Sequence, residues 1–101
     1  MSFYTPPTEV EPLGQAGTAR QLSAGSVSAN TALTVNVERI SMRAVGADIR
    51  YSIGYTAQTA TSTSHFIANG ERLDLAVPKN ANIAVIRNAG TNGTLEITEL
   101  N

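Results

Sequence analysis

Short segments in which apolar and polar residues alternate are the feature of this 101-residue sequence that most constrains its fold. In residues 38–44 (ERISMRA), Ile40, Met42 and Ala44 share one face and the intervening residues share the other. This is the period-2 pattern of a half-buried strand. The same pattern recurs in three later segments, at 48–55, 72–77 and 94–100. Because no segment shows the 3.6-residue period of a helix, the sequence predicts an all-β chain.

Turn residues separate these segments and predict how they pair. Gly46 lies between the strand expected at 37–44 and the strand expected at 48–55, so we expect these two to form an antiparallel hairpin. Asn69-Gly70, a strong hairpin turn, likewise links the short run 64–67 to the strand that follows it.

The remaining segments complete a two-layered fold. Pro78 ends a strand because it lacks the N–H that a ladder requires, and residues 83–86 are apolar on both faces, as in a central strand. Two further strands are expected at 19–23 and 26–35, whereas the polar segment 56–63 (TAQTATST) predicts an exposed loop joining the two halves. Seven or eight short strands indicate an antiparallel β-sandwich, either jelly-roll-like or a small barrel.

Residues 1–17 differ from the β-sandwich domain predicted for 18–101. They contain three of the four prolines beside Gly14 and Gly17, and they show no regular period, which predicts an extended arm. Apolar residues on such a segment cannot form a core of their own. They either rest on a neighbouring chain, rest on their own domain, or belong to a disordered tail. The candidate partner-binding residues of this arm are Phe3, Tyr4, Pro6, Pro7, Val10 and Leu13.

Composition excludes several classes of partner and chemistry. With 7 basic and 8 acidic residues and a net charge of -1, the chain has no basic surface for nucleic acid or anionic membrane. It has no cysteine for a disulfide, a thiolate nucleophile or a zinc-thiolate site. The N-terminus does not resemble a secretion signal, and no apolar run approaches the roughly 18 residues of a membrane span. We therefore expect a soluble protein made in the cytoplasm.

The sequence gives little support for catalysis. His65 is the only histidine, and its neighbour Ser64 would point to the opposite face of a strand, which is a poor geometry for a nucleophile–base pair. A structural, hydrogen-bonded histidine is the simpler interpretation. Asp74 and Glu96, expected on adjacent strands, could in principle act as acid and base, but cross-strand pairing with arginine is the simpler interpretation here too. We expect no catalytic residue, no metal site and no cofactor.

Binding surfaces remain open. Six of the seven basic residues are arginine, which suits either a contact surface or ordinary ion pairs on a sheet. Gly90 and Gly93 fit a hairpin turn better than a phosphate loop, since neither a lysine nor a helix follows them. Tyr51 and Tyr55 could form a carbohydrate-stacking face if both are exposed, although their match with Ile49 and Ile53 suggests burial.

Residues 60–78, 81–87 and 93–100, together with 43–54, resemble small β-rich virion structural proteins of tailed bacteriophages. The resemblance implies a non-enzymatic capsid decoration or cement protein on the virion surface. Its partners would be the major capsid protein or other virion proteins, and it would form a homo-oligomer, with a trimer as one possibility. The alternative is a tail-associated receptor- or carbohydrate-binding module, and a small enzyme is the third hypothesis.

Overall fold

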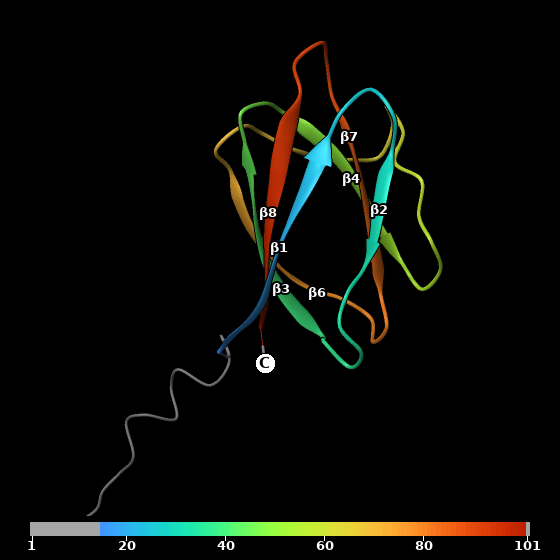
Figure 1. Cartoon of the computed structure of the whole chain (residues 1–101), viewed down its shortest axis with the longest axis vertical. Helices are drawn as coiled ribbons and strands as arrows, with labels where there is room; N and C mark the ends of the chain where they lie inside the picture. The colour runs from blue at the N-terminus through green and yellow to red at the C-terminus, as the bar shows by residue number, and fades with distance from the viewer. Residues whose placement is uncertain (1–14, 101) are drawn as a thin grey trace, which may run out of the picture.

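The computed structural model describes residues 15–100, which form eight strands in two sheets (Figure 1). The strands are β1 (Ala16–Ala24), β2 (Ala29–Ala32), β3 (Arg39–Val45), β4 (Ile49–Gly54), β5 (His65–Ile67), β6 (Arg72–Ala76), β7 (Asn82–Arg87) and β8 (Gly93–Leu100). Within this range there is no helix long and apolar enough to cross a membrane.

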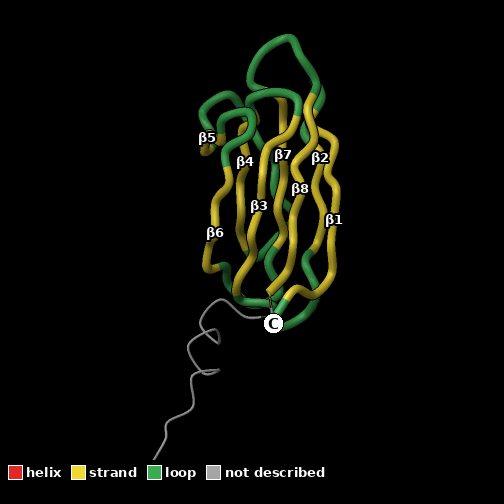
Figure 2. Tube along the Cα trace, turned by 90° about the vertical axis from the view of Figure 1, so that its left-hand side faces the viewer, coloured by secondary structure: helices red, strands yellow, loops and turns green. Residues whose placement is uncertain are grey.

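The two sheets are antiparallel and pack face to face. Sheet A has the order β1-β8-β3-β6, and sheet B has the order β2-β7-β4-β5 (Figure 2). Successive strands alternate between the sheets except at β4 and β5, which are neighbours in sheet B. This is the strand order of an eight-stranded jelly roll, so the expected all-β sandwich is confirmed.

Both predicted hairpins are wrong. β3 pairs with β6 and β8, while β4 pairs with β5 and β7, so the turn at Gly46 crosses from sheet A to sheet B. The turn at Asn69-Gly70 crosses back, because β5 lies in sheet B and β6 in sheet A. Gly46 and Gly70 do adopt the positive φ angles of tight turns, 93° and 83°. A strand can bury its one apolar face between the sheets whether the next strand pairs with it in the same sheet or crosses to the other sheet. The alternation of apolar and polar residues therefore does not distinguish a hairpin from a crossing connection.

The two crossing turns hold each other in place. The Asn69 side-chain oxygen accepts a hydrogen bond from the Gly46 N–H at 2.9 Å, and Asp48 Oδ1 accepts one from the Asn69 N–H at 2.8 Å. These bonds satisfy backbone donors that a hairpin ladder would otherwise have used.

Several strand predictions hold with shifted boundaries. β7 lies between β2 and β4, as expected of a strand that is apolar on both faces. The strand expected at 19–23 is the longer β1, and the one expected at 26–35 is the shorter β2. Because β1 begins at Ala16, the last two residues of the expected arm belong to a strand. The six candidate partner-binding residues of the arm lie outside the described residues.

The core fills the space between the sheets. Ile40, Met42 and Ala44 of β3 face Ile83 and Val85 of sheet B, and all five are essentially inaccessible to solvent. Each fully buried side chain of the size of Ile or Met contributes about 1.5 to 3 kcal/mol. The alternation in the sequence thus identifies the core face of β3 correctly.

The segment 55–64, which we call the strap, differs from expectation. It does not join the two halves of the molecule, because both its ends belong to sheet B, and it is not wholly exposed, since Ala60 is 2% exposed. In Figure 1 it forms the yellow-green loop beside β2 and β4. A polar segment without a regular period predicts a loop. Its composition does not indicate whether that loop packs against a sheet.

Candidate functional site

The strap covers the outer face of sheet B through hydrogen bonds centred on Gln58. The Gln58 N–H donates to Asn30 Oδ1 at 2.8 Å, and the Ser52 hydroxyl donates to Gln58 Oε1 at 2.7 Å. Asn30 and Ser52 flank Ala84 in the sheet register, and Ala84 is fully buried although it points outward. A neutral polar loop therefore takes the place that an apolar layer would occupy on this face.

The ends of the strap are fixed as well. Asn82 Nδ2 donates to the Tyr55 carbonyl at 3.2 Å, and Arg50 Nη1 donates to the Ser64 carbonyl at 3.0 Å. The Ala60 N–H donates to the Ser28 hydroxyl at 2.8 Å, next to edge strand β2. The strap is thus bonded to sheet B at its start, middle and end.

The outer face of sheet A carries no such cover among the described residues and faces the viewer in Figure 2. Arg43 on β3 lies opposite Glu96 on β8 and opposite Arg72 on β6. Arg72 Nε donates to the Ser41 hydroxyl at 3.1 Å and lies 3.9 Å from Asp74 Oδ1. This face is charged and solvated, with positive and negative groups intermixed.

The acid–base pair considered for Asp74 and Glu96 is wrong in its geometry. Asp74 lies on β6 and Glu96 on β8, and β3 separates these strands. Both carboxylates lie on exposed positions beside arginines, Asp74 near Arg72 and Glu96 opposite Arg43. Their surroundings fit the ion-pairing interpretation of a sheet surface.

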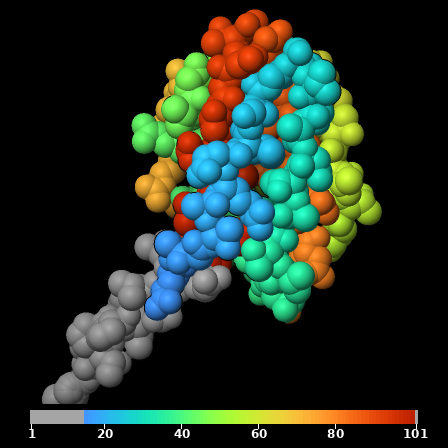
Figure 3. Space-filling model, in the orientation of Figure 1, coloured from blue at the N-terminus to red at the C-terminus, as the bar shows by residue number. Residues whose placement is uncertain are grey.

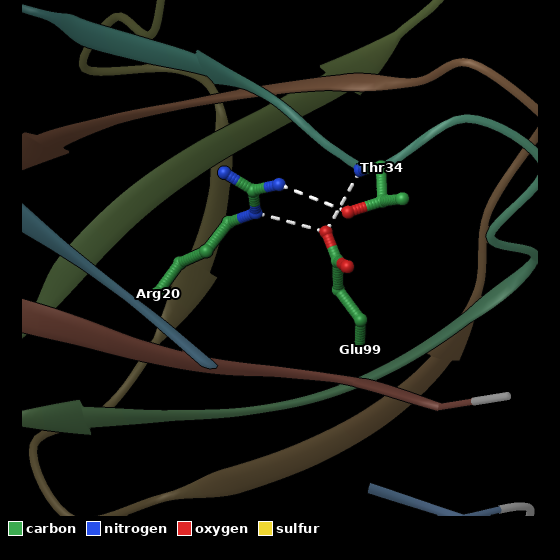
Figure 4. Close-up of polar contacts among 3 residues, drawn as sticks. All are labelled: Arg20, Thr34 and Glu99. Atoms are coloured by element: carbon green, nitrogen blue, oxygen red, sulfur yellow. Dashed lines mark hydrogen bonds and ion pairs between the residues drawn. The ribbon is translucent and has the colours of Figure 1, made fainter. Parts of the chain in front are cut away.

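A charged cluster lies between the sheets, where none was expected (Figure 4). Glu99 of β8 is 1% exposed, and its Oε2 accepts hydrogen bonds from Arg20 Nε and from the Thr34 N–H, each at 2.8 Å. Arg20 Nη2 also donates to the Thr34 hydroxyl at 3.1 Å. The cluster ties the loop between β2 and β3 to strands β1 and β8.

Burial of Glu99 opposes its negative charge, but the hydrogen bonds from Thr34 and Arg20 and the charge of Arg20 outweigh this and lower the pKa of its carboxyl. The sequence contained a signal for this residue. Leu95, Ile97 and Glu99 share parity on one strand, which places Glu99 on the core face. A carboxylate at a core position requires a partner, and Arg20 on the neighbouring strand β1 provides it.

The aromatic side chains do not form one face. Tyr51 is 7% exposed and points between the sheets, whereas Tyr55 is 75% exposed beyond the end of β4. Burial, and the nearby charge of Glu71, raise the pKa of the Tyr51 phenol. Phe66 is partly exposed, and the Arg50 guanidinium lies 4.8 Å from its ring centre. Arg50 lies on β4, whereas Tyr55 follows the last residue of that strand, Gly54. Five positions of extended chain span about 17 Å, which is too far for a single stacking platform.

His65 lies exposed at the start of edge strand β5, with its ring centre 5.3 Å from that of Tyr51. It is therefore held by ring packing on the edge of the sheet. The Ser64 hydroxyl accepts a hydrogen bond from the Thr61 N–H inside the strap. Between residues 15 and 100, no group of three or more His, Cys, Asp or Glu side chains is placed to hold a metal ion.

Comparisons of this chain with protein-family models, with curated proteins and with solved structures found no match.

Proposed function

We propose that this chain is a non-enzymatic structural protein of a phage particle, a decoration or cement protein that binds the shell of major capsid protein and stabilises it. The observation that carries the proposal is the eight-stranded jelly-roll order of the two sheets, an architecture that recurs in viral capsid proteins. The resemblance of residues 43–54, 60–78, 81–87 and 93–100 to small virion proteins points the same way.

The sandwich serves in this proposal as a rigid body. The strap is bonded to sheet B, and the Glu99 cluster ties the β2–β3 loop to sheet A, so both long connections are held. The chain before β1 supplies the contacts with the shell through Phe3, Tyr4, Pro6, Pro7, Val10 and Leu13. Proline lowers the entropy that such a segment loses on binding, and many weak contacts on one particle add up through avidity.

The copy number of the chain in purified particles tests the proposal. We expect quantitative mass spectrometry to find it in a number comparable to that of the major capsid protein, in hundreds of copies per particle. A dozen copies or fewer would move it to the tail or portal, and its absence from particles would refute a virion role.

The contribution of the segment before β1 is tested by a variant that lacks residues 2–14. The cut stops short of β1, which begins at Ala16, so the deletion should leave the two sheets and the melting temperature intact. We expect the variant to lose binding to particles that have been stripped of the native protein. Undiminished binding by a folded variant would refute the role of this segment.

The tail-associated receptor- or carbohydrate-binding module remains the second proposal, supported by the 75% exposure of Tyr55. It loses Tyr51, which is buried. If Tyr55 stacks on a sugar, Tyr55→Ala should abolish glycan binding without changing stability, whereas Tyr55→Phe should retain it. A wild-type protein that binds no glycan on an array would count against this function.

A further inference from the structure

The four edge strands of the sandwich differ in how they are protected from pairing with another chain. Edge strands expose unpaired N–H and C=O groups, and natural proteins keep them short, charged or covered. β5 has three residues, and β2 has four and is bonded to the strap through Asn30. β6 has five residues and carries the exposed charges of Arg72 and Asp74. These three edges are protected.

β1 is the exception. It has nine residues, with neither proline, lysine nor carboxylate among them, and it forms one rim of sheet A (Figure 2). In Figure 3 its blue residues lie on the surface, beside the cyan residues of the β1–β2 loop and β2. Its one charged residue, Arg20, points between the sheets to Glu99. A register shift between Ala16 and Ala19 makes the pairing of β1 with β8 irregular at the start of the strand, but the pairing from Ala19 to Ala24 is regular.

We propose that β1 pairs antiparallel with β1 of a second copy, which joins the two A sheets into one continuous sheet across a two-fold axis. Charge favours this edge over β6, since two β1 strands can meet without placing exposed like charges side by side. A two-fold contact of this kind is self-complementary and closes as a dimer.

The side chains fix the register. In a continuous sheet, opposite residues lie on the same face, so the outward-facing Ala19, Gln21 and Ser23 must lie opposite one another. Centring the contact on Arg20 would set two arginines directly opposite each other, which is destabilising. Shifting one β1 by one residue relative to the other would place outward-facing side chains opposite inward-facing ones. The longest remaining register places Gln21 opposite Gln21 and Ala19 opposite Ser23.

The pairing also brings the start of one β1 next to the β1–β2 loop of the second copy, because the two strands run antiparallel. That loop exposes Val27, at 77% the most exposed large apolar side chain of the described residues. The inference is independent of the virion role.

A cysteine scan tests the pairing directly, because the chain has no cysteine of its own. Opposite Cα atoms in an antiparallel pair lie about 4.5 to 5.5 Å apart, within the range of a disulfide. The full chain carrying Gln21→Cys should therefore form a covalent dimer under mild oxidation. Ser23→Cys is the matched control on the same face of the same strand, and it should stay monomeric on non-reducing gels. Equal cross-linking of the two variants, or none, would overturn the register.

A charge substitution tests the same contact without a covalent cross-link. In the proposed register Gln21→Lys places two like charges opposite each other, whereas Ser23→Lys places each lysine opposite Ala19. We expect sedimentation equilibrium to show a dimer whose dissociation constant rises about fivefold with Gln21→Lys and changes little with Ser23→Lys. A wild-type chain that stays monomeric at high concentration, or equal effects of the two substitutions, would refute the proposal.

Discussion

Two polar clusters each tie a long connection to a sheet, but they do so in opposite environments. The Glu99 cluster is charged and lies between the sheets, where it holds the β2–β3 loop through Thr34. The Gln58 cluster is neutral and lies on the outside of sheet B, where it holds the strap. A partly buried charge that loses its partner regains water only incompletely, whereas a neutral group near the surface can be satisfied by water. The first cluster should therefore dominate stability and the second should govern local order.

The largest effect is expected from Glu99→Ala. It leaves the Thr34 N–H without its acceptor and Arg20 without its counter-charge, and it opens a cavity between the sheets. Because Arg20 keeps 26% of its side chain exposed and can reach water, we expect a loss near the lower end for broken buried pairs, about 3 kcal/mol in the free energy of unfolding. Denaturant titration measures this loss.

Glu96→Ala is the matched control, since Glu96 lies on the same strand with its side chain on the exposed face. It should change the free energy of unfolding by less than about 0.5 kcal/mol. Similar losses of unfolding free energy in Glu99→Ala and Glu96→Ala would show that the burial of Glu99 does not increase its contribution to stability.

Glu96 and Glu99 lie on opposite faces of β8 because side chains alternate along a strand. This alternation also shows how much of the structure can be predicted from the sequence. Alternation identifies the strands, the core face of β3 and, with closer attention to residues 95, 97 and 99, the buried carboxylate. It does not identify which sheet a strand joins, because Gly46 and Gly70 provide a tight turn for a hairpin and for a crossing alike. The cover provided by the strap depends on hydrogen bonds between Gln58 and residues distant in sequence, and no local pattern encodes these.

Gly54→Ala should give the second largest effect, and it acts on the strap. A Cβ at this position would lie 2.5 Å from Gln58 Nε2, so the Gln58 side chain would have to move and lose its bond with Ser52. Because the Gln58 side chain can move away, the cost is that of the lost hydrogen bond, and we expect a loss of about 1 kcal/mol and faster proteolytic cleavage within residues 55–64.

Gly90→Ala is the control, because nothing lies within 4 Å of a Cβ at that position. It should leave both stability and cleavage unchanged. If Gly54→Ala is as well tolerated as Gly90→Ala, the strap does not depend on the close approach of Gln58 to β4.

Acid should separate the clusters further. Because the pKa of Glu99 is lower in the folded protein than in the unfolded chain, its contribution is complete above the unfolded value of about 4.5 and is lost as the pH falls through the folded value. In hydrogen exchange at pH 7 and at a series of pH values below 4.5, the protection of the Thr34 N–H should fall progressively as the pH is lowered. Protection of the Gln58 N–H, whose acceptor is the neutral Asn30 amide, should change much less. Equal losses at both amides would mean that acid loosens the whole sandwich and not the Glu99 cluster.

The smallest effect is expected where the neutral cluster has already been removed. Gln58→Ala deletes the group that a Cβ on Gly54 would meet, so in that background Gly54→Ala should cost less than about 0.5 kcal/mol. The losses of unfolding free energy in the two single variants should therefore not add, and a double-mutant cycle by denaturant titration measures the difference as a coupling energy.

Glu99→Ala has no shared partner with Gln58→Ala, so the losses of unfolding free energy in that pair should be additive. Additivity in the Gly54 cycle would show that the glycine matters for the backbone of β4 and not for the strap, and coupling in the Glu99 cycle would show that the two clusters form a single network.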